Sequence, residues 1–255
     1  MSETGQDPTW CPEGWERHPY DHGNHSHGFY VIDPALKGIA SPSVLILHEF
    51  PGIATDLVPL VDKLSQDFHV VVPSIFGRDG DANCVDSTKQ ICVRREVHLL
   101  ALHQVSASVG WLRDFAKEHV ARGRNEPYGV IGMCFTGNFV LALAVDPRVT
   151  AAVVAQPSFP LWPSSLGLSP QDRDALQTRT NLLVQGYRFP RDCLSAAAKL
   201  NSAQGLLGSE RMDDFQLGGR NEWKHSTLTK HGDESAVEGV TLFLTKRLFG
   251  QEPSA

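Results

Sequence analysis

Short apolar runs recur along this chain, and polar segments or segments with glycine or proline separate them. The runs are rich in Val, Ile and Leu without polar alternation, which is typical of parallel strands buried on both faces. They lie at residues 28–33, 44–49, 69–74, 128–132, 151–156 and 181–186, and a less apolar stretch at 212–217 can form a last strand. Because parallel neighbours need a long crossover between them, this pattern constrains the fold more than any other feature.

Segments with helical periodicity lie between several of these runs. Apolar residues at helical spacing occur in two of them, at Val105, Val109, Leu112 and Ala116 and at Val237, Val240, Leu244 and Leu248. Strands that alternate with helices predict an α/β fold, with a mainly parallel sheet and helices on both faces. In such sheets ligands bind beyond the carboxyl ends of the strands, so functional residues should follow the apolar runs.

The length and composition favour one large domain. A chain of 255 residues with 41% hydrophobic residues can bury one sizeable core. We expect this domain to span residues 28–250, after a polar arm with histidines and tryptophans at 1–27 and before a short tail at 251–255. Residues 158–172 look irregular and are interpreted as a loop or lid near the site.

Charge and cysteine content exclude several classes of protein. The formal net charge of -6 argues against a non-specific nucleic-acid binder, which needs a basic face. No apolar run approaches the roughly 18–20 residues that span a membrane, and the N-terminus lacks the apolar core of a signal peptide. Five cysteines without CxxC spacing indicate neither a disulfide framework nor a four-cysteine zinc site. We expect a cytoplasmic protein with reduced thiols, a small-molecule substrate and no cofactor.

The N-terminal arm carries a histidine cluster that could bind a metal ion. Its candidate ligands are Cys11, His18, His22, His25 and His27. No carboxylate partner stands at a recognised spacing, so an exposed arm is favoured and no metal site is predicted. In a further alternative, two tryptophans of the same arm, at positions 10 and 15, pin it to the domain surface.

The stretch GVIGMCFTG at 129–137 carries the first sign of catalysis. An apolar strand enters a Gly-x-Cys-x-x-Gly turn, and a helix begins near Asn138. Turns of this kind hold a nucleophile in strained geometry above the sheet. The N–H groups at the helix start stabilise a thiolate and an oxyanion, and the Phe135 N–H is one predicted oxyanion donor. Alternatively, Cys134 is a small buried residue without reactivity.

Partners for Cys134 follow in the order that α/β-hydrolases use, which is nucleophile, acid and histidine. Asp192 lies in the loop beyond one apolar run, whereas Asp213 and Asp214 lie inside the last predicted strand. Two histidines precede the final helix. His225 is favoured over His231, because the sequence around His231 is typical of the start of that helix.

Four motifs together resemble the dienelactone hydrolase (carboxymethylenebutenolidase) family, the cysteine branch of the α/β-hydrolase fold. The resemblance covers roughly residues 28–250. The motifs are the elbow Gly132-Met133-Cys134, the glutamate turn His48-Glu49-Phe50-Pro51-Gly52, the acid Asp192 and the pair His225-Ser226. Two features depart from the family pattern: Thr136 stands where a glycine is common, and Asp192 follows Gly186 at a longer spacing than usual.

The resemblance implies a hydrolase that opens a cyclic enol lactone to a maleylacetate-like product, through a Cys-His-Asp triad and a thiol acyl-enzyme. An enolate leaves easily, so a thiolate suffices where poorer leaving groups favour serine with stronger general-base help. The resemblance gives Glu49 a resting contact with the thiol of Cys134 that substrate displaces, which also protects the sulfur from oxidation. It makes the Phe50 N–H the second oxyanion donor.

The family's substrate carries a carboxylate, so the resemblance implies an arginine in the site. Arg95 fits the family position best, and Arg94, Arg78 and Arg188 are alternatives. Ser226 is carried over as a substrate contact.

Two other functions remain open on the sequence. One is a carboxylesterase or thioesterase of the same fold that acts on other activated esters. The other is a non-catalytic binding module with this fold, which is disfavoured because every catalytic role has a candidate residue. The sequence indicates no oligomeric state.

Overall fold

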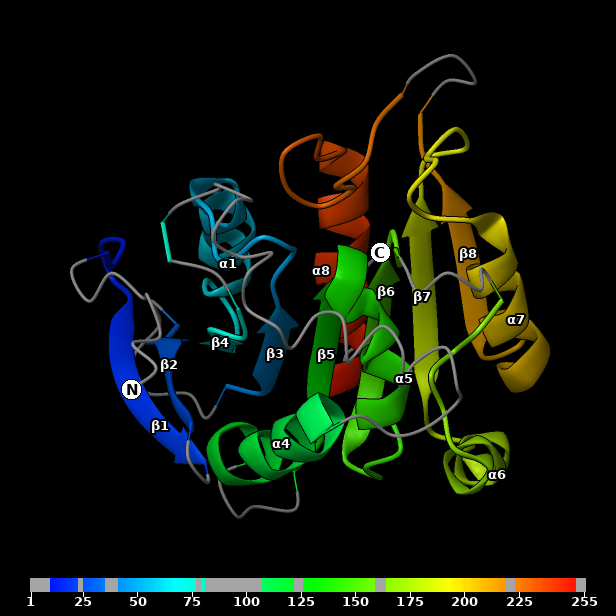
Figure 1. Cartoon of the computed structure of the whole chain (residues 1–255), viewed down its shortest axis with the longest axis horizontal. Coiled ribbons are helices and arrows are strands. Elements are labelled where there is room, and N and C mark those ends of the chain that lie inside the picture. The colour runs from blue at the N-terminus through cyan, green and yellow to red at the C-terminus, as the bar shows by residue number, and fades with distance from the viewer. Residues whose placement is uncertain are drawn as a thin grey trace.

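A computed structural model of the chain shows a single sheet with helices on both faces (Figure 1). The structure describes residues 10–22, 25–34, 41–76, 79–80, 107–121, 126–158, 164–218 and 223–250.

Eight strands form this sheet in the order β1-β2-β4-β3-β5-β6-β7-β8. They are β1 (Glu16–His22), β2 (His25–Ile32), β3 (Ser43–Leu47), β4 (His69–Pro73), β5 (Tyr128–Met133), β6 (Val149–Ala155), β7 (Leu183–Arg188) and β8 (Met212–Gln216). From β4 to β8 all neighbours are parallel, while β2 is antiparallel to both β1 and β4. The predicted α/β fold class is confirmed, and every predicted strand is present.

Helices connect most of these strands. They are α1 (Val58–Leu64) after a 3-10 turn (Thr55–Leu57), α4 (Ala107–Phe115) with a π-helical end (Ala116–Val120), the 3-10 helix η3 (Cys134–Asn138), α5 (Val140–Leu143), α6 (Pro170–Thr178), α7 (Ala197–Leu207) and α8 (Glu234–Phe249). The sequence analysis did not predict α1 or α6. Helix α6 begins inside the segment 158–172 that was expected to be irregular, because Ser169 caps it and its side chain accepts a hydrogen bond from the Asp172 N–H. Residues 159–163 of that segment lie outside the described residues.

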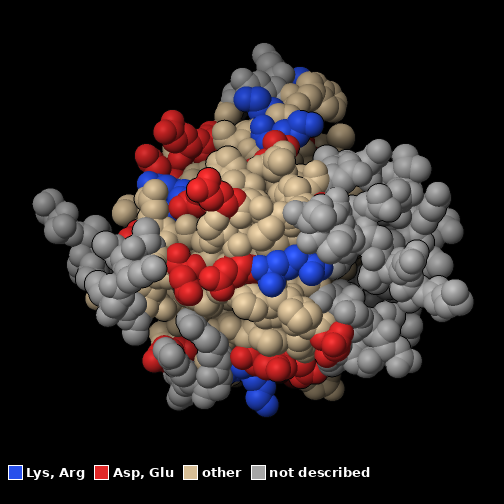
Figure 2. Space-filling view, turned by 90° about the vertical axis from the view of Figure 1, so that its left-hand side faces the viewer, with Lys and Arg blue, Asp and Glu red and all other residues tan. Residues whose placement is uncertain are grey.

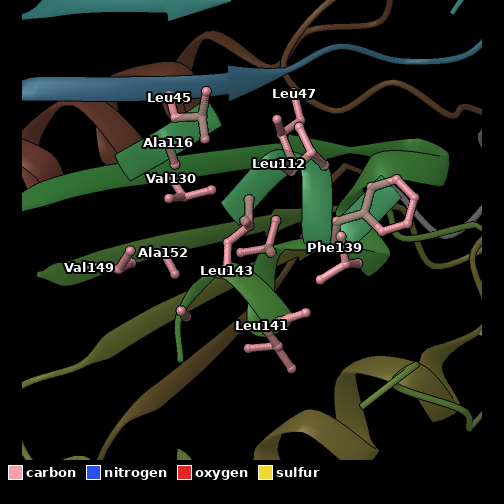
Figure 3. Packing of buried hydrophobic residues seen from close by; sticks show 14 of the residues in the cluster. Leu45, Leu47, Leu112, Ala116, Val130, Phe139, Leu141, Leu143, Val149 and Ala152 are labelled. Carbon is pink, nitrogen blue, oxygen red and sulfur yellow. The ribbon is translucent and has the colours of Figure 1, made fainter. Parts of the chain in front are cut away.

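Two hydrophobic layers bury the two faces of the sheet. Successive residues of β3 point to opposite sides, so Leu45 and Leu47 join one layer and Val44 and Ile46 the other. Helices α4, α5, α6 and α7 cover the first layer, and α1 and α8 cover the second. Figure 3 shows part of the first layer, where Leu47 of β3 lies near Leu112 of α4, and Leu141 and Leu143 of α5 belong to the same cluster. Burial on both faces explains why the strand sequences are apolar without alternation.

The sheet extends beyond the predicted boundary at residue 27, because that residue lies inside β2 and the preceding residues form the edge strand β1. Trp15 is 5% exposed, and its ring centre lies 5.5 Å from that of Tyr30 and 6.0 Å from that of Trp10. The indole N–H of Trp15 donates to the Asp62 carboxylate at 3.3 Å. Residues from Trp10 onward therefore belong to the domain, as the tryptophan-pinned alternative predicted.

The surface of the described residues is mixed in charge. Figure 2 shows one face on which groups of acidic side chains stand among separate basic ones, in keeping with the negative formal charge of the chain. Among the described helices, none combines the length and the apolar character that crossing a membrane requires.

Trp15 supplies a test of whether the arm belongs to the domain. We expect Trp15→Ala to lower the free energy of unfolding by about 3–5 kcal/mol, because truncating a buried tryptophan leaves a cavity. Urea unfolding followed by circular dichroism measures this loss. The control is Leu242→Ala on α8, whose side chain is 60% exposed and should matter by less than about 0.5 kcal/mol. Equal midpoints for the two variants would contradict the assignment of the arm to the domain.

Candidate active site

The carboxyl ends of β3 and β5 lie at the topological switch point of this sheet. Strands β3 and β5 are neighbours. The chain continues from β3 to β4 on one side and from β5 to β6 on the other, so the two connections leave the ends of β3 and β5 in opposite directions. Ligands of open α/β sheets bind at such a switch point. Glu49 follows β3 here, and Cys134 follows β5 directly.

Cys134 sits in a strained turn between β5 and η3. Its φ is +55°, a left-handed conformation that non-glycine residues seldom adopt. Gly132 is required beside it, because a Cβ there would lie 2.4 Å from the Val140 side chain and 2.8 Å from the Thr136 carbonyl oxygen. The Cys134 side chain is half-buried. This is the geometry expected of a nucleophile elbow.

Thr136 fastens this turn to the neighbouring strand. Its buried hydroxyl lies 2.9 Å from the Leu47 carbonyl oxygen and 3.0 Å from that of His48, at the end of β3. The same hydroxyl accepts a hydrogen bond from the Met133 N–H at 3.1 Å. The threonine that replaces the family's glycine therefore joins the elbow to β3, and the sequence analysis missed this role.

His225 and Asp192 meet across two loops. The Nδ1 atom of His225 lies 2.5 Å from the carboxylate of Asp192, whose side chain is 2% exposed. The other oxygen of Asp192 accepts hydrogen bonds from the N–H groups of Leu194 (2.9 Å) and Ser195 (3.2 Å). Because β7 and β8 are neighbours, the loops beyond their ends bring the acid and the histidine together.

The environment of His225 favours the imidazolium form. Burial alone would lower the pKa of His225, but the hydrogen bond to Asp192 and the neighbouring Cys134 side chain raise it to about 10. Among the described residues Nε2 has no hydrogen-bond partner of ordinary geometry, although the sulfur is near enough to act on the ring. Such contacts often tighten only when substrate binds. Nε2 is thus the nitrogen left to exchange a proton with the sulfur.

The rival residues lie elsewhere. His231 is exposed, and its Nδ1 atom is 2.8 Å from the carbonyl oxygen of His225. Asp213 and Asp214 lie in β8, as expected, and Asp213 is exposed. The structure therefore brings Asp192 and His225 together and leaves the other three outside this contact.

Arg188 stabilises the acid loop. Its buried guanidinium donates to the carbonyl oxygens of Ser195 (3.2 Å) and Pro190 (3.3 Å), on either side of Asp192. Arg95, Arg94 and Arg78, the other arginines considered for a substrate carboxylate, lie outside the described residues. The prediction that Arg95 binds a substrate carboxylate stays a prediction.

Glu49 has different partners from those that the family resemblance implies. One oxygen accepts hydrogen bonds from Gln156 Nε2 (2.6 Å) and Thr229 Oγ1 (2.8 Å), and the other accepts one from Ser226 Oγ (2.7 Å). Among the described residues its carboxylate makes no hydrogen bond to Cys134. The carboxylate instead connects the end of β3 with the loop that carries His225. The hydroxyl of Ser226, the expected substrate contact, donates its hydrogen bond to Glu49.

Gln156, directly after β6, completes the connection. Its amide oxygen accepts hydrogen bonds from the N–H of Thr227 (3.0 Å) and from the hydroxyl of the same residue. Gln156 is fully buried and has a φ of +33°. The sequence analysis missed this residue, although a polar side chain at the end of the apolar run AAVVAQ was a usable signal.

The side chain of Ser158 contacts the sulfur of Cys134. Its Oγ atom lies 3.0 Å from Cys134 Sγ, and its N–H donates to the Cys134 carbonyl oxygen at 3.0 Å. The side chain is fully buried. The sequence analysis placed this residue in an irregular segment and gave it no role.

The two expected oxyanion donors, Phe50 and Phe135, follow the ends of β3 and β5. Phe135 is the second residue of η3, so its N–H has no acceptor within the helix. Phe50 follows Glu49, and its ring centre lies 5.7 Å from that of Phe76. No group of His, Cys, Asp and Glu side chains that could hold a metal ion occurs within the described residues.

The sheet, the elbow after β5, the acid after β7 and the histidine after β8 define the α/β-hydrolase fold with an ester-hydrolase type of site. A family model for the dienelactone hydrolase family matches residues 28–184. The chain belongs to the dienelactone hydrolase family.

Three solved structures with this fold have names that state a type of enzyme. A Klebsiella pneumoniae protein assigned as a dienelactone hydrolase has a TM-score of 0.63 and 15% identity, and the match covers 93% of this chain and 99% of that one. A dienelactone hydrolase-like promiscuous phosphotriesterase from metagenomic libraries has a TM-score of 0.61 and 17% identity, with 93% and 98% covered. An esterase of Pyrococcus furiosus has a TM-score of 0.60 and 12% identity, with 95% and 97% covered. At these identities the likeness shows the fold alone. The curated proteins contain no significant match to this sequence.

The contact between Asp192 and His225 leads to a prediction about the pKa of the histidine. Asp192→Asn should lower the pKa of His225 from about 10, because an amide does not stabilise the imidazolium. NMR titration of the ring measures this shift. Asp213→Asn, which changes an exposed carboxylate of β8, is the matched control and should leave the titration unchanged.

The same pair links stability to pH. The pKa of His225 is raised above its ordinary value of 6.5, so the pair stabilises the fold fully below about pH 6.5 and loses this contribution as the pH rises through about 10. Free energies of unfolding from urea titrations at pH 6 and pH 10 should therefore differ more for the parent than for Asp192→Asn. An equal difference would contradict the assignment of the pair.

The contacts of Glu49 lead to a prediction about residues 226–229, the loop that follows His225. Glu49→Gln should lower the free energy of unfolding by about 1–3 kcal/mol, because a glutamine amide has one acceptor oxygen where the carboxylate uses two. Hydrogen exchange in residues 226–229 should become faster. Glu234→Gln, on an exposed residue of α8, is the control. Unchanged exchange in the loop would show that Glu49 does not hold it.

Proposed function

We propose that the protein hydrolyses esters with good leaving groups, and in particular opens a cyclic enol lactone of the dienelactone type to a maleylacetate-like product. Cys134 is the nucleophile, His225 the general base and acid, and Asp192 the residue that orients the imidazole. One observation carries the proposal: a cysteine in a strained elbow lies beside a histidine whose Nδ1 is held 2.5 Å from a buried aspartate.

In the first half-reaction the sulfur replaces the ester oxygen. His225 Nε2 takes the proton of the thiol, and Asp192 stabilises the imidazolium that forms. The sulfur attacks the carbonyl carbon, and the N–H groups of Phe50 and Phe135 stabilise the oxyanion. The carbon–oxygen bond of the ring then breaks, and the enolate oxygen takes the proton of the imidazolium while it stays attached to the acyl group through the opened ring. A thioester of Cys134 remains.

In the second half-reaction water releases the acid. His225 removes a proton from the water as its oxygen attacks the thioester carbonyl. The carbon–sulfur bond breaks, and the sulfur leaves as a thiolate that can regain the proton from His225. The carboxylic acid product leaves, and the enzyme returns to its starting state.

The contacts of Glu49 support a positioning role within this mechanism. Its carboxylate binds Ser226 and Thr229, which follow His225 in the same loop. Loss of this carboxylate would let the loop move and take the imidazole away from the sulfur. For a carboxylated lactone, Arg95 is the proposed partner of the substrate carboxylate, and Ser226 the proposed substrate contact.

A second candidate function is hydrolysis of other activated esters, with apolar rather than carboxylated groups. Two exposed apolar side chains favour it. Leu194, two residues after Asp192, is 47% exposed, and Trp223, two residues before His225, is 72% exposed. Exposed apolar side chains on the loops that carry the proposed acid and histidine suit an apolar substrate.

The proposed nucleophile also restricts the compartment. Among the described residues Cys11, Cys134 and Cys193 are free thiols. A thiol nucleophile needs a reducing environment to stay active, which supports the expected cytoplasmic location.

Cys134→Ala tests the mechanism. We expect it to reduce the hydrolysis rate by about 10⁴-fold or more, because the covalent step is lost, while the melting temperature stays close to that of the parent. The assay uses dienelactone and neutral 4-nitrophenyl esters. Mass spectrometry of the parent under turnover should show a thioester on the peptide with residue 134. Cys11→Ala, an exposed cysteine of the N-terminal segment, is the control.

Two outcomes would contradict parts of this proposal. Equal rates for Cys134→Ala and the parent would remove Cys134 as the nucleophile. Turnover of neutral aryl esters without turnover of the lactone would replace the first function with the second.

A further inference from the structure

The sulfur of Cys134 has a hydroxyl partner rather than a carboxylate partner. Ser158 Oγ lies 3.0 Å from Cys134 Sγ, a distance at which either group could donate the hydrogen. The three oxygen contacts of Glu49 go to Gln156, Ser226 and Thr229 instead. The position that the family resemblance gives to a glutamate is therefore taken in this chain by a serine.

The main chain of Ser158 is held on both sides. Its N–H donates to the carbonyl oxygen of Cys134 at 3.0 Å, and its own carbonyl oxygen accepts a hydrogen bond from Asn138 Nδ2 at 2.6 Å. Asn138 also donates to the Phe135 carbonyl oxygen at 2.7 Å, and its side-chain oxygen accepts a hydrogen bond from Lys199 Nζ. These buried contacts tie Ser158 to the elbow itself, so the hydroxyl moves with the sulfur that it contacts.

A hydroxyl and a carboxylate have opposite effects on a thiol. A carboxylate beside the sulfur favours the neutral thiol, because two negative charges repel each other. A hydroxyl can donate its proton to a thiolate and so favour the charged form. The imidazolium form of His225, which Asp192 stabilises, acts in the same direction.

We propose that Ser158 is a further catalytic residue, whose hydroxyl donates a hydrogen bond to the thiolate that forms when His225 takes the proton of Cys134. This inference rests on the proposed function, in which Cys134 is the nucleophile. The same hydrogen bond stabilises the sulfur when it leaves the thioester in the second half-reaction. Ser158 thereby assists both the formation and the release of the acyl-enzyme.

The test is the rate of alkylation of Cys134 by iodoacetamide as a function of pH, measured on the full chain. Peptide mass spectrometry distinguishes this cysteine from the others. In Ser158→Ala we expect the midpoint of the profile to move up by about one pH unit, which is a tenfold loss of thiolate below the midpoint. Ser43→Ala, which removes a buried hydroxyl at the opposite end of β3, is the control and should keep the parent profile.

A matched pair of variants separates the hydroxyl from the packing around it. Ser158→Thr and Ser158→Val have the same shape and differ only in a hydroxyl against a methyl group. Thr should keep a midpoint near that of the parent, while Val should show the shift. The comparison of Ser158→Thr with Ser158→Val also tests the role of the hydroxyl if Ser158→Ala does not fold.

The outcomes separate this inference from the proposed function. Identical alkylation profiles for Ser158→Thr and Ser158→Val, or an unchanged profile in Ser158→Ala, would overturn the role of Ser158. If the parent hydrolyses none of the esters but Ser158→Ala still shifts the profile, the contact is correct and the proposed function is wrong. Accumulation of acyl-enzyme in Ser158→Ala under turnover would support both.

Discussion

A hydrogen bond between two neighbouring strand ends holds the turn on which the proposed chemistry depends. The hydroxyl of Thr136 reaches the carbonyl oxygens at the end of β3, so the turn that carries Cys134 cannot move away from that strand. A positive φ at a cysteine is unfavourable and persists only where the surroundings over-determine it. The close approach at Gly132 and the bond between the N–H of Ser158 and the carbonyl of Cys134 complete that restraint.

A second set of contacts positions the histidine relative to this turn. Glu49 and Gln156 lie at the ends of β3 and β6, and both bind residues that follow His225. Buried polar groups are costly unless they are paired, so a network in which every member is satisfied specifies one arrangement of the loop. The three side chains of the proposed triad come from loops far apart in sequence, and their geometry depends on these polar contacts.

The sequence predicted the sheet well, because strands buried on both faces must be apolar throughout. It missed β1, since the edge strand Glu16–His22 is polar and resembles a solvated arm. It also missed α6, which has few apolar residues and depends on its cap. The positions of Cys134, Asp192 and His225 could be predicted because each residue follows a strand. The partners of Glu49 and Cys134 could not, because they depend on side-chain directions in loops, for which sequence has no periodicity.

Whether a carboxylate or a hydroxyl lies beside the sulfur affects which classes of ester the protein can hydrolyse. If a glutamate held the thiol neutral, a substrate would need its own negative charge to displace it, and activation would be confined to carboxylated lactones. In the proposed role of Ser158 no displacement is needed, since its hydroxyl already lies 3.0 Å from the sulfur and would stabilise the thiolate as it forms. The same nucleophile would then attack neutral activated esters, in agreement with the exposed apolar side chains near Asp192 and His225. It would also be more open to oxidation, because thiolate character determines the susceptibility of a cysteine.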